Sequence, residues 1–112
     1  MSTTRRNTLR EVMNLAWQFV KRNGFSMSEA MKVAWTNVKV RTRMRDGIVK
    51  FYFRKVDGTM REAYGTLQER LIPAHTDGQA GRKKNDTVQT YYDTEKQDWR
   101  CYKKANIVLM AF

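Results

Sequence analysis

The side chains best suited to chemistry in this sequence are cations that gather near the middle of the chain. Lys and Arg suit phosphate groups, because each phosphate that is neutralised releases a counterion. Tyr52 lies among them and could stack on a base of a single-stranded nucleic acid. The sequence therefore predicts a nucleic-acid-binding surface, although a solvated polar face opposite buried residues explains the same pattern. Its members are Lys39, Arg41, Arg43, Arg45, Lys50, Tyr52, Arg54 and Lys55.

A second candidate contact is a basic segment that follows two glycines. Gly78 and Gly81 precede Arg82, Lys83 and Lys84. Loop amides and cations of this kind could hold a phosphate. The segment does not match a P-loop, because no Lys-Ser or Lys-Thr pair opens a helix. We expect either a contact loop or a solvated linker.

Side chains for catalysis or metal binding are scarce. His75 is the only histidine and Cys101 the only cysteine, and neither has partners at the spacing of a metal site or an activated nucleophile. Asp93, Glu95 and Asp98 flank an expected turn, and turn chemistry explains them more simply than acid–base work. We therefore expect a protein that is not an enzyme and has no metal or cofactor.

Charge is distributed unevenly along the 112 residues, whose net charge is +11. Residues 1–55 hold 13 Lys and Arg against 3 Asp and Glu (+10), whereas residues 56–112 hold 9 against 8 (+1). This asymmetry predicts a polyanion, or else an acidic protein surface, as the partner. The absence of a secretory signal, a membrane span and a second cysteine predicts a cytoplasmic protein of a bacterial or phage-infected cell, without membrane contact.

Apolar spacing predicts two helices near the N-terminus. From Thr8 onward, apolar residues recur every three or four positions until Gly24, which can end a helix in a left-handed conformation. Ser26 and Glu29 form a capping box that begins a second helix. We expect residues 1–6 to be a frayed polar arm. The matched stripes and short connection predict an antiparallel helical hairpin.

Residues 38–45 allow two interpretations. They alternate with a period of two, which is typical of a strand and would place four cations on one face. A helix that continues to about Met44 fits as well. We favour the helix because no stop signal precedes Gly47.

After Gly47 the sequence favours short strands. Asp57-Gly58 is a hairpin signal, Gly65 suggests a bend, and residues 68–86 read as a long exposed loop. Residues 107–110 are apolar on both faces and predict a buried closing strand. Five antiparallel strands with one long loop describe a small barrel. The expected strands are 48–54, 59–66, 87–93, 98–103 and 107–110.

Motifs in the second half resemble a known family. The stretch Phe51-Tyr-Phe-Arg-Lys-Val-Asp-Gly-Thr-Met-Arg-Glu-Ala-Tyr-Gly-Thr-Leu67 is followed by Val88-Gln-Thr-Tyr-Tyr-Asp-Thr-Glu-Lys-Gln-Asp-Trp-Arg100 and by Asn106-Ile-Val108. Together they resemble small WYL-like proteins with an Sm-like or SH3-like β-barrel, which are typical of Bacteroides and their phages and mobile elements. The resemblance covers residues 48–108.

The resemblance implies a fold and a general role but no individual site residue. WYL barrels are linked to nucleic acids or nucleotide-like ligands in regulators and defence systems, although the Trp-Tyr-Leu tripeptide is absent from this chain. We predict an α+β fold, with an N-terminal helical hairpin followed by a small five-stranded antiparallel SH3-like β-barrel. Residues 1–45 would form the basic arm and hairpin, and residues 46–112 the barrel, in one compact unit.

The leading functional expectation is a non-catalytic nucleic-acid-binding accessory or regulatory protein of a phage or mobile element. One alternative is a phage-encoded inhibitor that binds a host defence protein or enzyme through an acidic surface. Another is a virion or assembly component that uses its helices to oligomerise. The choice between DNA and RNA and the oligomeric state stay open.

Overall fold

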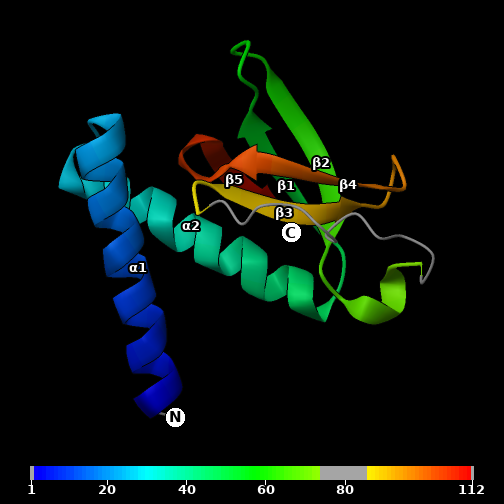
Figure 1. The fold of residues 1–112 in the computed structure, drawn as a ribbon, viewed down its shortest axis with the longest axis horizontal. Helices are drawn as coiled ribbons and strands as arrows, with labels where there is room; N and C mark the ends of the chain where they lie inside the picture. Colours follow the sequence, from blue (N-terminus) through cyan, green and yellow to red (C-terminus); the bar gives the residue numbers. More distant parts are fainter. Residues whose placement is uncertain (1, 74–85, 112) are drawn as a thin grey trace.

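The computed structural model describes residues 2–73 and 86–111. Two helices, α1 (Ser2–Asn23) and α2 (Met27–Asp46), precede five strands, which are joined in part by two short 3₁₀ helices (Figure 1). The predicted α+β fold is therefore confirmed. The later elements are β1 (Val49–Arg54), β2 (Met60–Thr66), η1 (Glu69–Leu71), β3 (Val88–Asp93), β4 (Asp98–Lys103), η2 (Lys104–Asn106) and β5 (Ile107–Ala111).

The boundaries of α2 follow from its local sequence. Ser26 Oγ accepts a hydrogen bond from the Glu29 backbone N–H at 3.2 Å, as an N-cap residue does. Gly24 adopts a positive φ of 72° in the connection between the helices. α2 then continues to Asp46, so residues 38–45 are helical, as we favoured.

The start of α1 corrects the predicted frayed arm. Residues 2–6 belong to the helix, because no glycine or proline interrupts the chain before Gly24. The helix therefore begins about two turns before the apolar stripe from which we placed its start.

α1 and α2 form the expected helical pair, packed through an apolar cluster. Figure 1 shows them splaying apart from their short connection, so that α1 points away from the sheet while α2 runs along it. α2 contributes Val40 and Met44 to a second cluster inside the barrel. Because α2 packs into both clusters, it ties the helical pair to the barrel. The helical cluster consists of Val12, Leu15, Ala16, Phe19, Ala30, Ala34 and Val38.

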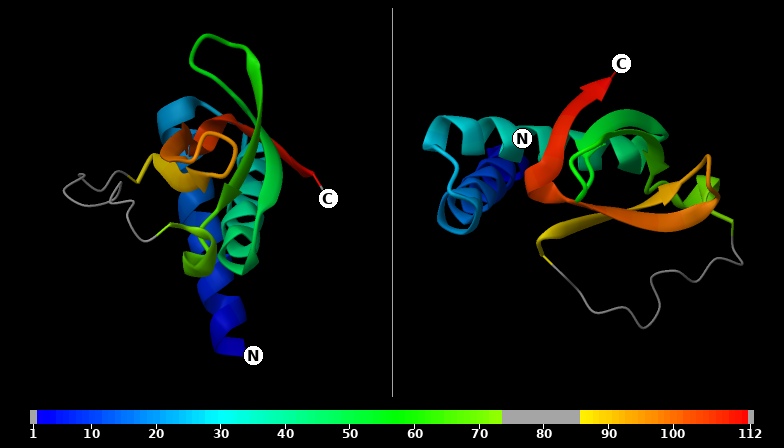
Figure 2. Two further views of the ribbon diagram at one scale, coloured as in Figure 1. Left: turned by 90° about the vertical axis from the view of Figure 1, so that its right-hand side faces the viewer. Right: turned by 90° about the horizontal axis from the view of Figure 1, so that it is seen from above.

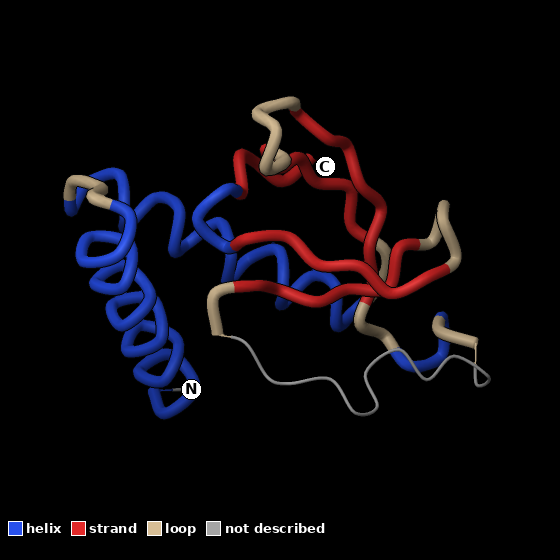
Figure 3. Tube along the Cα trace, turned by 45° about the horizontal axis from the view of Figure 1, so that its top comes forward, coloured by secondary structure: helices blue, strands red, loops and turns tan. Residues whose placement is uncertain are grey.

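The strands form one antiparallel sheet in the order β4-β3-β2-β1-β5. β2 and β3 are paired only through Gly65 with Asp93 and Thr66 with Tyr92, so the sheet bends sharply there. One turn of η2 then carries the chain from β4 across to the free edge of β1. The result is a strongly curled sheet, with the β1–β2 and β3–β4 hairpins as its two arms (Figures 2 and 3).

β5 departs from the prediction of a buried closing strand. Val108 and Leu109 are 38% and 46% exposed. β5 pairs with β1 on one side and ends the sheet order on the other. This edge strand is therefore partly exposed to solvent, although its residues are apolar.

Candidate nucleic-acid interface

The predicted cations of α2 do not form one surface. On a helix, residues four apart share a face, so Lys39 and Arg43 lie on one side and Arg41 and Arg45 on another. Lys39, Arg43 and Arg45 are exposed. Arg41 is half-buried, and its guanidinium donates two hydrogen bonds to the carboxylate of Glu11 in α1.

Lys50 and Tyr52 belong to a self-contained cluster on β1 and β2. Lys50 Nζ lies 3.7 Å from a Glu62 carboxylate oxygen and 5.8 Å from the ring centroids of Tyr52 and Tyr64. The hydroxyls of Tyr52 and Tyr64 donate to Glu62 at 3.1 and 3.0 Å. The charge of Lys50 is thus locally balanced, and the Tyr52 hydroxyl already has a partner.

Arg54 and Lys55 lie elsewhere, in a groove at the open side of the barrel. This hollow of about 830 Å³, here called the barrel groove, lies between the β1–β2 hairpin and β4. Five cations line it together with two carboxylates, Asp57 and Asp98. The five cations are Arg54, Lys55, Arg61, Arg100 and Lys103.

Aromatic residues form the floor of the barrel groove. Tyr91, Tyr102 and Trp99 line it, and the two tyrosines are 0% and 2% exposed. Their hydroxyls and the Trp99 indole Nε1 are buried without a hydrogen-bond partner among the described residues. Buried polar atoms normally find a partner. The three atoms are buried beneath the lining of the groove, so what the groove offers a ligand is its cations and the half-buried Trp99.

Two hydrogen-bonded anchors fix the arms of the groove. Arg54 donates to the Gly58 carbonyl at 3.1 Å, which ties it to the β1–β2 turn. Arg61 Nη2 lies 2.7 Å from the carboxylate of Asp93, whose side chain is fully buried. The other Asp93 oxygen accepts the backbone N–H groups of Glu95 and Lys96, both at 3.0 Å, and so holds the β3–β4 turn.

The buried tyrosines should make the protein less stable in alkali. Burial raises the pKa of Tyr91 to about 12 and raises the pKa of Tyr102 well above its ordinary value. A raised pKa in the folded state favours folding while the hydroxyl stays protonated. This contribution is complete below about pH 10, the ordinary tyrosine pKa, and is lost as the pH rises toward 12 and beyond.

Urea unfolding at several pH values from about 8 to about 12 measures this effect. We expect the midpoint to fall above about pH 10, and to fall less in Tyr102→Phe. A midpoint that falls equally in both proteins would contradict a role for the Tyr102 hydroxyl.

Sequence reasoning found two of the groove cations and missed the other three. Arg61, Arg100 and Lys103 lie in the expected strands 59–66 and 98–103 and were not among the predicted contacts. The signal that could have found Arg100 is the pairing of β3 with β4, which places Arg100 opposite Tyr91. The candidate residues Arg82, Lys83 and Lys84 lie outside the described residues.

The described residues show neither a metal site nor a membrane-spanning helix. No group of three or more His, Cys, Asp or Glu side chains is arranged there to hold a metal ion. Nor does either helix have the length and apolar character that crossing a membrane requires, as far as the described residues go.

The strand order and curled sheet define an SH3-like barrel preceded by a helical pair. A family model described as WYL_2, with an Sm-like SH3 β-barrel fold, matches residues 37–108. The chain belongs to this family, as the motifs predicted, and membership indicates a regulatory or ligand-binding role. The match begins within α2, which fits the packing of that helix into the barrel core. Neither the curated proteins nor the solved structures include a match.

Proposed function

We propose that this protein is a non-catalytic nucleic-acid-binding accessory or regulatory protein, and that the barrel groove is its main contact surface. The observation that carries the proposal is the combination of five cations with aromatic side chains in the lining of one groove. The resemblance to small proteins of phages and mobile elements suggests that biological setting. A cytoplasmic location would follow from it.

The shape and chemistry of the groove favour a single strand. Cations along a groove can follow the phosphates, while aromatic rings receive unpaired bases, and neither contact depends on sequence. Trp99 is half-buried at the groove, so the exposed part of its ring could meet a base, whereas Tyr91 and Tyr102 are too buried to stack on one. A duplex would present few exposed base faces to such a floor, so we expect single-stranded DNA or RNA to bind more tightly.

The exposed cations of α2 add positive charge on two sides of that helix. Lys39, Arg43 and Arg45 have no ion-pair partner among the described residues. They raise the local positive potential and would attract any polyanion at long range. They remain predicted contacts of the same nucleic acid.

Fluorescence anisotropy of labelled single- and double-stranded DNA and RNA across a salt series tests the proposal. The groove variant Arg54→Gln/Arg100→Gln/Lys103→Gln should bind single strands at least about 100-fold more weakly at low salt, since it removes three charge-assisted contacts. Loss of three phosphate contacts should also reduce the salt slope by about 2.

The matched control is Lys39→Gln/Arg43→Gln/Arg45→Gln, which removes the same charge from α2. It should lose much less affinity than the groove variant. Equal losses in both variants would mean that only total charge matters. A loss confined to the α2 variant would move the site to that helix. No binding by the unmodified protein would overturn the nucleic-acid proposal.

A protein partner is the second candidate, and the surface of α1 favours it. Leu9, Met13 and Trp17 follow one another at four-residue spacing and are 47%, 39% and 48% exposed. Lys21 and Arg22 continue the helix beyond them. An exposed apolar stripe beside cations suits an acidic amphipathic partner. One stoichiometric protein that survives nuclease treatment in a pull-down, and that Trp17→Ala loses, would support this alternative.

A further inference from the structure

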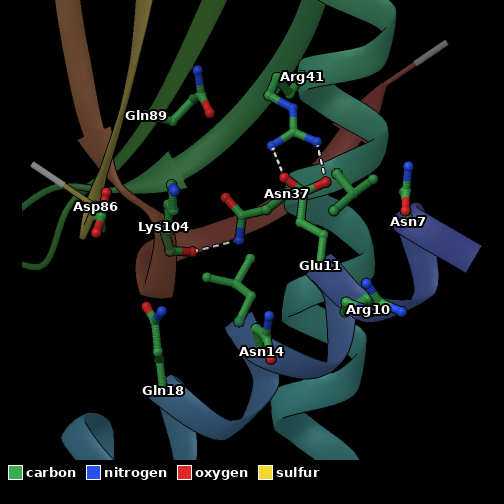
Figure 4. Close-up of a pocket in the computed structure, with 12 residues that line it drawn as sticks. Asn7, Arg10, Glu11, Asn14, Gln18, Asn37, Arg41, Asp86, Gln89 and Lys104 are labelled. Carbon is green, nitrogen blue, oxygen red and sulfur yellow. Dashed lines mark hydrogen bonds and ion pairs between the residues drawn. The ribbon is translucent and has the colours of Figure 1, made fainter. Parts of the chain in front are cut away.

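A second hollow lies where the helical pair meets the barrel. This hollow of about 340 Å³, here called the junction cleft, is lined by α1, α2, η2 and the beginning of β3 (Figure 4). It is at the small end of the volumes that hold small molecules. Its polar lining includes Arg10, Asn14, Gln18, Asn37, Gln89 and Lys104.

Asn37 has an unsatisfied oxygen at this cleft. The residue is 5% exposed, and its amide Nδ2 donates to the carbonyls of Val33 and Lys104 at 2.9 and 2.8 Å. These two acceptors fix which end of the amide is nitrogen. The oxygen, Oδ1, is then left without a hydrogen-bond donor among the described residues, which costs free energy until a donor arrives.

The charges of the cleft leave a small positive excess. Arg41 and Glu11 neutralise each other, although the Arg41 Nε is also buried without a described partner. Lys104 is half-buried, and burial together with Arg41 lowers its pKa. No described carboxylate lies within ion-pair distance of Lys104. Arg10 and Lys104 therefore face only Asp86 as a remaining opposite charge, which suits a ligand with one net negative charge.

The lining also limits the chemical class of the ligand. Apart from Leu15 and Val38, the described lining side chains are amides and charged groups. None of them is aromatic, so the cleft offers no ring on which a nucleobase could stack. This distinguishes it from the barrel groove, whose floor is aromatic.

We propose that the junction cleft binds a small, non-aromatic anion that also carries an N–H donor, the chemistry of a free acidic amino acid. A carboxylate of the ligand would pair with Lys104, and its ammonium group would donate to Asn37 Oδ1. The second carboxylate would lie toward Arg10, at the exposed side of the cleft. Such a ligand would hold α1 against η2 and β3. This proposal does not depend on the proposed binding of nucleic acid in the barrel groove.

Two adjacent lysines give a matched test. Lys104 lines the junction cleft, whereas Lys103 lines the barrel groove. Titrations of the full chain, followed by calorimetry and by amide chemical shifts, would use L-glutamate, glutarate, L-glutamine and 5′-AMP as probes. We expect L-glutamate to bind, and Lys104→Gln to weaken it about tenfold or more, as the loss of one charged hydrogen bond does. Lys103→Gln should leave this affinity unchanged.

The other probes test separately how much the ammonium group and the net charge of the ligand contribute to binding. Glutarate lacks the ammonium group and L-glutamine lacks the net charge, so each should bind about tenfold more weakly than L-glutamate. Three results would overturn the proposal: tighter binding of 5′-AMP than of L-glutamate, equal weakening by the two lysine variants, or no shift at Asn37 with any probe at millimolar concentration. An unchanged urea midpoint for Lys104→Gln would show that a lost affinity is not a loss of folding.

Discussion

Replacing Gly65 with alanine should lower the free energy of unfolding by about 3 kcal/mol, the upper end of the usual cost of overpacking a core. A Cβ at this position would lie 2.6 Å from Cδ2 of Tyr91 and 3.1 Å from Cε1 of Phe51. Both rings are 0% exposed, so neither can move aside without disturbing its neighbours. Because Tyr91 is part of the groove floor, the same change should also weaken nucleic-acid binding.

Gly47→Ala is the matched control for Gly65→Ala. A Cβ at Gly47 would meet no heavy atom within 4 Å, and its φ of 176° is extended backbone. This substitution should change the free energy of unfolding by less than about 1 kcal/mol, with a small gain from the stiffer unfolded chain. Urea unfolding followed by tryptophan fluorescence measures both. Equal stability of the two variants would show that the Tyr91 ring moves easily, which would contradict a rigid groove floor.

Local signals explain why most of the fold could be predicted. The Ser26 cap, the Asp57-Gly58 turn and the alternation in residues 49–54 each act over a few residues, so the sequence alone displays them. The hairpin turn forms as expected: the Gly58 N–H donates to the Lys55 carbonyl at 2.9 Å, with Gly58 at a φ of 93°.

Two details of the fold were predicted wrongly, namely the start of α1 and the burial of β5. Their physical causes lie outside those local signals. The apolar stripe of α1 begins near Leu9, but the helix begins at Ser2, in a polar segment that no glycine or proline interrupts. Residues 107–110 are apolar enough for a central strand. However, η2 leads the chain to the outer edge of β1, so β5 becomes an edge strand. Val108 and Leu109 are therefore exposed.

The candidate site was harder to predict because it depends on contacts between distant residues. Arg41 pairs with Glu11, 30 positions away, and Arg61 with Asp93, 32 positions away. Neither pairing has a sequence signature. The predicted cations were grouped by their nearness in sequence, whereas the curled sheet gathers Arg54 and Arg100 from different hairpins.

The five buried polar atoms without a described partner divide between the two hollows. Three are carried by residues that line the barrel groove, and two, Asn37 Oδ1 and Arg41 Nε, by residues that line the junction cleft. A stable fold avoids such atoms unless something else compensates for them. The linings of the two hollows differ in chemistry, since one contains aromatic residues and cations and the other is rich in amides, and this difference is the reason to expect two different ligands.

Asp93→Ala should be at least as damaging as Gly65→Ala, with a loss of about 3–5 kcal/mol in the free energy of unfolding, as is typical when one partner of a buried ion pair is removed. Asp93 is 0% exposed and pairs with Arg61 at 2.7 Å. Its loss would leave Arg61, whose side chain is only 21% exposed, without its counter-charge. The backbone N–H groups of Glu95 and Lys96 would also lose their acceptor.

Two further variants separate these contributions in urea unfolding. Asp93→Asn keeps an oxygen for the turn but removes the charge, so it should lose less than Asp93→Ala. Glu62→Gln breaks the exposed pair with Lys50 and should have little effect, because exposed ion pairs contribute little to stability. If Asp93→Ala proved as mild as Glu62→Gln, Asp93 would not hold the two hairpins together. The cations of the barrel groove would then lack the fixed spacing on which the proposed binding of a nucleic-acid strand depends.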